Sequence, residues 1–194
     1  MKKSLELKYQ TPKEWAKIPL SDFNSFLQDH ADCERKASAM AMSFVAKCPD
    51  KTEIIPLLIE TAMEELEHFQ QVYQLMEKRG VQLKTEIDED NYVNELIKLC
   101  RHGKGERLLD RMLLASIIEC RGAERFRLIE EALDDTDLKK FYKMLWASEA
   151  KHGNIFVEMA LKYWDEKTVY KRLEELNNEE AKICEKLPWR AAMH

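Results

Sequence analysis

Two pairs of metal-binding residue types occur at the same spacing in this chain. Glu65 and His68 lie three positions apart in the run MEELEHFQQV, and Glu149 and His152 lie three apart in WASEAKHGNIF. Residues three apart on a helix lie on the same face, so each pair presents a carboxylate and an imidazole together. Both groups are ligands for divalent transition metals. One such pair alone is a weak signal, because glutamate is frequent in this sequence.

A further glutamate precedes each pair by about thirty residues. Glu34 lies 31 positions before Glu65, and Glu119 lies 30 positions before Glu149. Each of these two glutamates interrupts the apolar stripe of a predicted helix. Glu124, by contrast, lies about 140° from Glu119 around the same helix and faces elsewhere. The order Glu, then Glu-x-x-His, therefore occurs twice in the chain.

Four carboxylates on apolar helix faces need compensating cations. A lone histidine on such a face is more often a hydrogen-bonded core residue. Four unpaired buried carboxylates, however, would each cost several kcal/mol, and the same stripes carry no lysine or arginine near them. Two divalent metal ions supply the charge, in the pattern of di-iron or di-manganese carboxylate proteins. The predicted ligands are Glu34, Glu65, His68, Glu119, Glu149 and His152.

Six predicted helices position these residues. Four are long, at about 21–47, 50–80, 106–133 and 137–164, and two further helices are predicted at about 92–100 and 166–187. The long helices form two hairpins joined by a crossover of about 25 residues, which predicts an all-α, ferritin-like four-helix bundle with additional short helices. We expect a single domain over 1–194, with the core bundle at about 21–164.

Capping signals give the expected helix ends. Ser21 or Asp22 is predicted to cap the first long helix. Asp50 with Glu53 resembles a capping box for the second, with Gly80 just past its end. Asp165 is predicted to cap the last helix.

Composition sets limits on location and partners. The chain has 194 residues and a net charge of -5, which argues against general nucleic-acid binding but allows a specific RNA ligand. Its five cysteines include no C-x-x-C pair, and no apolar signal region precedes them, so we expect an intracellular, cytoplasmic protein. No apolar run approaches the roughly 20 residues of a membrane span.

The predicted metal site alone leaves three classes of function open. They are a substrate hydroxylase or desaturase, an iron-oxidising or peroxide-scavenging protein, and a structural bundle stabilised by metal. A rubrerythrin-like protein would carry a C-x-x-C module, which this sequence lacks. A ferritin-like iron store is compatible with the same ligands.

Four segments around the predicted ligands resemble one protein family. They are HADCERKASAMA, EELEHFQQV, IIECRGAERF and ASEAKHG, and the lead-in TPKEW is similar to the same family. Together they resemble the bacterial tRNA hydroxylases called MiaE, over roughly Leu7 to Tyr163. The resemblance implies O2-dependent hydroxylation of the isopentenyl group on 2-methylthio-isopentenyladenosine, next to the tRNA anticodon.

The resemblance also implies the cofactors and partners. The six ligands hold two iron ions bridged by carboxylates, with O2 as co-substrate and no catalytic residue beyond the ligands. Electrons come from an external donor, a reductase or a ferredoxin-type protein, and tRNA is the substrate. The alternative is a ferritin-like iron-oxidising or peroxide-scavenging protein without an RNA substrate.

Basic residues in CRHGKGERLLDR are the candidate tRNA contacts. Arg101, Lys104 and Arg107 are the first choice, and the lysines at 139, 140 and 143 are the second. A charged run is more often a solvated helix face, so both assignments stay open.

Small residues near the ligands have two interpretations. They leave room for a five-carbon prenyl group, or they let the helices approach closely. These residues are Ala37, Ser38, Ser116 and Gly122.

Overall fold

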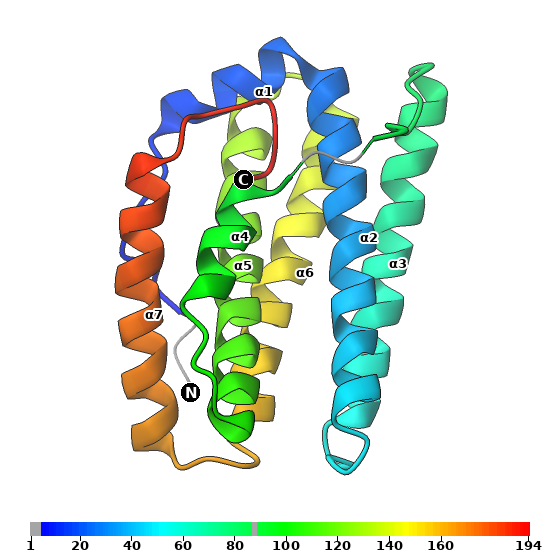
Figure 1. Cartoon of the computed structure of the whole chain (residues 1–194). Coiled ribbons are helices and arrows are strands. Elements are labelled where there is room, and N and C mark those ends of the chain that lie inside the picture. Colours follow the sequence, from blue (N-terminus) through cyan, green and yellow to red (C-terminus); the bar gives the residue numbers. More distant parts are fainter. Residues whose placement is uncertain (1–4, 87–88) are drawn as a thin grey trace. The chain divides into compact units, whose positions relative to one another are not determined.

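Every regular element that the structure describes is helical. The computed structural model describes residues 5–86 and 89–194, and its elements are η1 (Lys13–Ala16), α1 (Lys17–Ser21), α2 (Phe23–Lys47), α3 (Ile55–Lys78), α4 (Asn91–Lys98), α5 (Lys104–Ala132), α6 (Thr136–Ala160) and α7 (Glu166–Lys186) (Figure 1). The predicted polar connection at 81–90 contains residues 87–88, which lie outside the described ranges. The all-helical prediction is confirmed.

The chain divides into two compact units. The α2–α3 unit comprises 17–88 and 190–193, and the α5–α6 unit comprises 1–16, 89–189 and His194. Each long hairpin lies within one unit, so the two repeats of Glu followed by Glu-x-x-His fall in different units. No described helix combines the length and the apolar character needed to cross a membrane.

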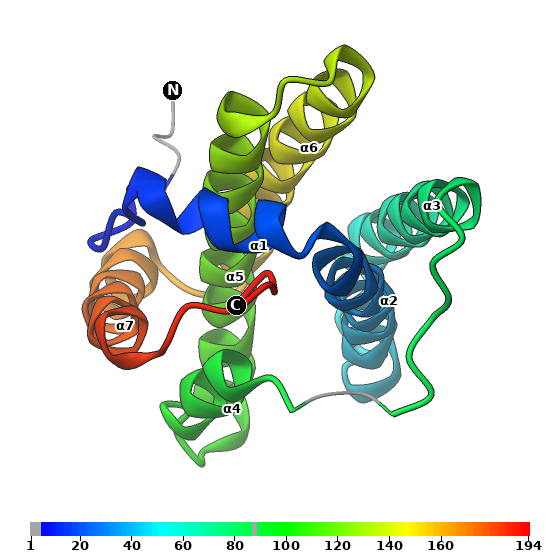
Figure 2. The ribbon, with the colours of Figure 1, turned by 90° about the horizontal axis from the view of Figure 1, so that it is seen from above.

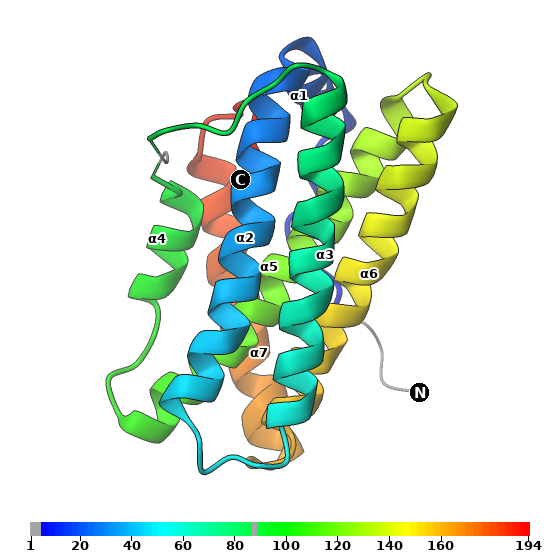
Figure 3. The same cartoon turned by 90° about the vertical axis from the view of Figure 1, so that its right-hand side faces the viewer.

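In the α2–α3 unit, two long helices run side by side as a hairpin (Figures 1 and 3). The carboxylate of Asp22 caps α2 by accepting a hydrogen bond from the Ser25 amide, as predicted. Gly80 follows α3 with a φ of 67°, a left-handed conformation that glycine adopts without strain.

The predicted capping box at the start of α3 is wrong. The helix begins at Ile55, after Asp50 and Glu53, and Ile54 supplies no side-chain cap. The backbone first makes a tight turn in which the Ile54 amide bonds to the Lys51 carbonyl. Pro56 then fits the first helical turn, where a missing N–H costs nothing.

In the α5–α6 unit, α5 is the central helix. It contacts α6 along the hairpin and also touches η1, α4 and α7 (Figure 2). Asp135 caps α6, and Asp165 caps α7 by accepting from the Thr168 amide. α6 ends at Ala160, four residues before the predicted end at Trp164.

A buried ion pair ties α7 to α5. The Arg121 guanidinium, which is 0% exposed, donates to both carboxylate oxygens of Glu180 and also contacts Glu124. The Tyr92 hydroxyl donates to Glu180 from α4. Burial by itself would lower the pKa of Arg121, but hydrogen bonding and the charge of Glu180 raise it, so the pair stays ionised. Glu124, predicted to face away from Glu119, is thus part of this network.

Candidate metal centre

The α2–α3 unit brings three predicted ligands together. His68 Nδ1 lies 3.4 Å from Glu65 Oε2 and 3.7 Å from Glu34 Oε2. One ligand atom from each residue lies within 4.8 Å of the others. The three side chains are 1–4% exposed. Two carboxylates and one imidazole therefore converge in a buried position.

Local structure explains this convergence. Glu65 and His68 are three apart on α3 and share its buried face. Across the hairpin, the Ser38 hydroxyl donates to the Ala62 carbonyl at 2.8 Å. This bond fixes the register of α2 against α3, one turn from Glu34.

His30 is a functional residue that the sequence argument did not assign. Its Nε2 lies 2.7 Å from Glu34 Oε1, and His30 and Glu34 are 0% and 4% exposed. The contact occupies Oε1 and leaves Oε2 as the oxygen nearer His68. Outer partners of this kind orient the ligands of metal sites. The signal was available, because His30 lies four residues before Glu34 on the same stripe.

The α5–α6 unit repeats the arrangement with Glu119, Glu149 and His152. His152 Nδ1 lies 3.5 Å from Glu149 Oε2. One ligand atom from each of the three lies within 4.8 Å of the others, and the three side chains are 0–6% exposed. Each unit therefore carries one glutamate plus one Glu-x-x-His pair.

A close contact between α5 and α6 adjoins this second cluster. A Cβ atom on Gly153 would lie 2.6 Å from Cys120 Sγ and 3.2 Å from the Ser116 carbonyl oxygen. The Ser116 hydroxyl donates to the Gly153 carbonyl at 2.7 Å. Ser38 and Ser116 both bond across their hairpins, which favours close helix approach over prenyl-group space as the reason for these small residues.

Cys120 is a packing group in this contact. Burial raises the pKa of its thiol to about 12, so the thiol is neutral at physiological pH. A neutral thiol next to Glu119 fills space against Gly153.

The donor set of each cluster fits a divalent metal. Ligand bonds of about 2.1 Å place neighbouring ligand atoms of one ion about 3 Å apart. The observed nitrogen–oxygen separations of 3.4–3.7 Å need only a small closure to reach that distance. Mixed carboxylate and imidazole ligation suits iron, manganese or zinc more than calcium or magnesium.

The predicted tRNA contacts have different surroundings. Lys104 and Arg107 are exposed in the first turn of α5. Arg101 instead makes a bidentate contact with Asp110, which is 0% exposed, and a third bond to Glu106. Arg101 is therefore committed to an ion pair within its own unit.

Asp110 is held by two arginines. Arg172 also donates to its carboxylate, at 2.9 and 3.1 Å. Burial acts to raise the pKa of Asp110, but hydrogen bonds from Arg101 and Arg172 outweigh it and lower the pKa. This cluster joins the loop before α5 to α7.

The second basic group lies on α6. Lys140 pairs with Asp137 at 3.5 Å in an exposed position, and Lys143 is exposed. Exposed pairs of this type contribute little to stability.

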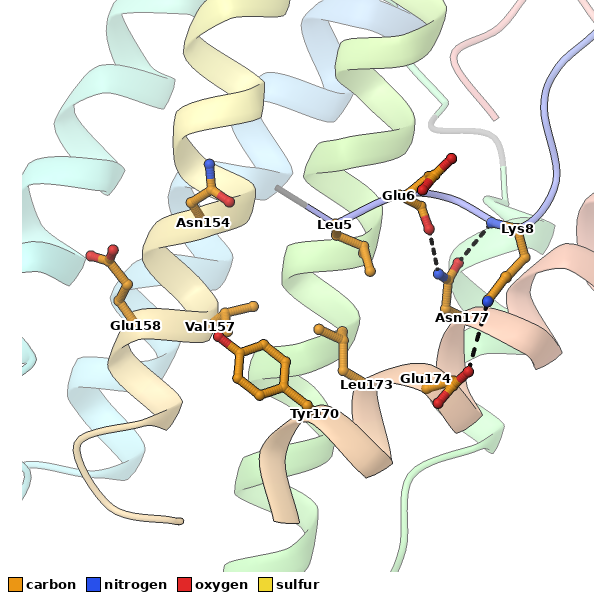
Figure 4. A pocket seen from close by; sticks show the side chains of 10 residues that line it. All are labelled: Leu5, Glu6, Lys8, Asn154, Val157, Glu158, Tyr170, Leu173, Glu174 and Asn177. Carbon is orange, nitrogen blue, oxygen red and sulfur yellow. Dashed lines mark hydrogen bonds and ion pairs between the residues drawn. The ribbon is translucent and has the colours of Figure 1, made fainter. Parts of the chain in front are cut away.

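A groove of about 740 Å³ lies on the α5–α6 unit between α6, α7 and the N-terminal segment (Figure 4). The Asn177 amide brackets that segment, donating to the Glu6 carbonyl and accepting from the Lys8 amide. The groove shares no residue with the metal cluster. We therefore assign it no part in the metal chemistry.

Comparison with known proteins gives a consistent match. The family model described as tRNA-(MS[2]IO[6]A)-hydroxylase (MiaE) matches residues 2–194. A tRNA 2-(methylsulfanyl)-N(6)-isopentenyladenosine(37) hydroxylase from Pseudomonas putida is 35% identical over 84% of this chain and 79% of its own length. The protein of the same name from Salmonella typhimurium is 32% identical over 56% of this chain and 39% of its own length.

A solved structure matches nearly the whole chain. It is Protein 43 with aldehyde deformylating oxygenase activity from Synechococcus, with a TM-score of 0.91 and 32% identity over 97% of this chain and 94% of that chain. This match confirms the ferritin-like, all-α class that the sequence predicts.

Proposed function

The chain belongs to the tRNA-(MS[2]IO[6]A)-hydroxylase (MiaE) family, and we propose that it is an O2-dependent di-iron monooxygenase acting on tRNA. Its substrate is the isopentenyl group of 2-methylthio-isopentenyladenosine next to the anticodon. One observation of the fold carries the proposal: each unit holds a buried glutamate together with a Glu-x-x-His pair. A tRNA substrate places the enzyme in the cytoplasm.

The two clusters are the ligand sets for iron. Glu34, Glu65 and His68 supply one set, and Glu119, Glu149 and His152 supply the other. Bound iron provides the activation of O2 that inserts one oxygen atom into a C–H bond. In this proposal the two units form one ferritin-like domain whose carboxylates bridge two iron ions.

The protein side chains set the conditions for this chemistry. His30 holds one oxygen of Glu34, so the carboxylate keeps a fixed orientation toward His68. The ligand side chains are at most 6% exposed, which limits bulk water at the reacting position. Electrons come from an external donor protein, a reductase or a ferredoxin.

For the tRNA contact we propose Lys104 and Arg107. Both are exposed at the beginning of α5, where cationic side chains can reach phosphate oxygens. Arg101, which was predicted with them, contributes by fixing the preceding loop to Asp110.

Metal analysis tests the ligand assignment. The purified protein is expected to bind close to two irons per chain, and Glu119→Ala or His152→Ala to lose iron and hydroxylation together. Glu124→Ala is the control that keeps its iron, since Glu124 bonds to Thr11 and Arg121. Full iron binding by the Glu119 variant would contradict the assignment.

The same titration separates the enzyme from an iron store. A ferritin-like store takes up many irons per chain in a closed shell, whereas the hydroxylase stops at two in a small species. Light scattering measures the particle size. A shell of 24 chains, roughly, would favour the store.

The Synechococcus structure motivates a second candidate, aldehyde deformylation. The expected test reaction is the release of formate from a long-chain aldehyde by the iron-loaded, reduced protein. Formate release without oxygen insertion into tRNA would favour this activity over tRNA hydroxylation.

A further inference from the structure

Thr61 is a buried polar residue whose hydroxyl has no role in the fold. The side chain is 2% exposed, and Thr61 Oγ1 has no hydrogen-bond partner among the described residues. Buried hydroxyls in native proteins nearly always pair with protein, water or ligand atoms. A hydroxyl kept at such a position points to a partner outside the polypeptide.

The location of Thr61 indicates which partner. It lies on α3 four residues before Glu65, on the buried face that also carries His68. Residues four apart on a helix are neighbours, with Cβ atoms about 5–6 Å apart. The Thr61 hydroxyl is therefore one turn from the carboxylate of Glu65, a distance that a single small molecule can bridge.

The facing helix offers no competing polar side chain. Ser38 lies opposite Ala62, and Glu34 lies opposite His68, so the antiparallel register brings the 37–41 turn of α2 to the level of Thr61. On the buried stripe of that turn, the side chains of Ala37 and Ala41 are single methyl groups. The hydroxyl of Ser38 is already used by the Ala62 carbonyl.

We propose that the Thr61 hydroxyl hydrogen-bonds to the small oxygen-bearing or anionic ligand bound at the Glu34–Glu65–His68 cluster. The inference rests on the proposed iron site and adds a substrate-side residue to it. Hydroxylation inserts one atom of O2 into a C–H bond and reduces the other to water, using two electrons from the external donor and two protons from solvent. A hydroxyl at this position holds the water through which one of those protons arrives.

Azide binding to the iron-loaded, oxidised protein tests the proposal without tRNA. Thr61→Val removes the hydroxyl and keeps the shape of the side chain. We expect its azide dissociation constant to rise about 5- to 10-fold, the effect of losing one hydrogen bond to a charged ligand. Thr61→Ser keeps the hydroxyl and is expected to restore the wild-type value. A second readout is product formed per O2 consumed, which falls in Thr61→Val and recovers in Thr61→Ser.

Ser38→Ala is the matched control. It removes a hydroxyl one turn away on the hairpin that is already bonded to a carbonyl, so azide affinity is expected to stay within twofold of wild type. Equal azide affinity in Thr61→Val and wild type would overturn the proposal. If Thr61→Val also loses iron, the serine variant decides: wild-type azide affinity supports the hydrogen bond, and weakened affinity contradicts it. Absence of iron from the wild-type protein would instead contradict the proposed function itself.

Discussion

The Ser116 hydroxyl donates a hydrogen bond to the Gly153 carbonyl at 2.7 Å, across the α5–α6 hairpin. Both residues adjoin predicted ligands, since Gly153 follows His152 and Ser116 lies three before Glu119. The bond forms where the two backbones come close, because Gly153 has no side chain. The second cluster thus depends on a packing contact as well as on its ligands.

Gly153→Ala is expected to disturb that contact. The added methyl group meets Cys120 Sγ at 2.6 Å and the Ser116 backbone oxygen at 3.2 Å. Overpacking of this kind costs about 1–3 kcal/mol. We expect lower stability in urea unfolding and weaker metal binding by the α5–α6 cluster.

Two variants serve as controls for Gly153→Ala. Adding Cys120→Ala to it removes the closest clash and is expected to recover part of the stability. In Gly105→Ala the new methyl group meets nothing within 4 Å, and the helix start is unharmed. A Gly153→Ala protein as stable as wild type, with unchanged metal affinity, would contradict the packing argument.

His30→Ala is expected to weaken metal binding at the α2–α3 cluster. Glu34 loses the partner 2.7 Å from its Oε1, so its carboxylate is no longer held in one orientation. Loss of such an outer partner costs about 10- to 100-fold in metal affinity. Titration with Co(II) against a competing chelator measures the change. His102→Ala, at an exposed position before α5, is the control, and equal losses in both variants would remove the assigned role.

Lys104→Ala with Arg107→Ala is expected to weaken tRNA binding and to reduce its salt dependence. Loss of two phosphate contacts lowers the slope of log affinity against log salt concentration by about 1–2. Iron content is expected to stay the same. Lys182→Ala on α7, where the lysine pairs with Glu179, is the control. An unchanged salt slope in the double variant would exclude this surface.

Asp110→Asn is expected to destabilise the α5–α6 unit by about 2 kcal/mol at neutral pH, because the carboxylate bonds to both Arg101 and Arg172. The arginines lower the pKa of Asp110 in the folded state. The stabilisation is therefore complete above the unfolded pKa near 4 and is lost as pH falls through the folded value. Denaturant unfolding of both proteins measures the difference, which shrinks in acid; a difference that grows in acid would contradict this origin.

The ligand clusters illustrate how far the sequence argument reached. Glu34 and Glu119 stood out because a charge on an apolar helix stripe needs a reason, and the structure places each with its own Glu-x-x-His pair. Helix periodicity is a local property, so it is readable from one chain. The hydrogen bond between His30 and Glu34 is equally local, and a search for polar pairs four apart on the same stripe would have found it.

Long-range contacts were beyond that argument. The Arg121–Glu180 pair joins residues 59 positions apart, and nothing in either local sequence names the partner. Arg101 seemed suited to tRNA for the same reason, because its bond to Asp110 depends on how the loop folds back on α5. The start of α3 was misplaced because Asp50 and Glu53 have the right spacing for a capping box, whereas a tight turn delays the helix to Ile55.

Labelled oxygen provides the most direct test of the central claim. The iron-loaded protein, a chemical or protein reductant and ¹⁸O2 are incubated with tRNA that carries 2-methylthio-isopentenyladenosine, and the digested nucleosides are weighed by mass spectrometry. We predict one labelled oxygen atom on the isopentenyl side chain, with none in a parallel incubation of the Glu119→Ala protein. Unmodified prenylated nucleoside after incubation with protein that holds two irons per chain would contradict the assignment as a tRNA hydroxylase.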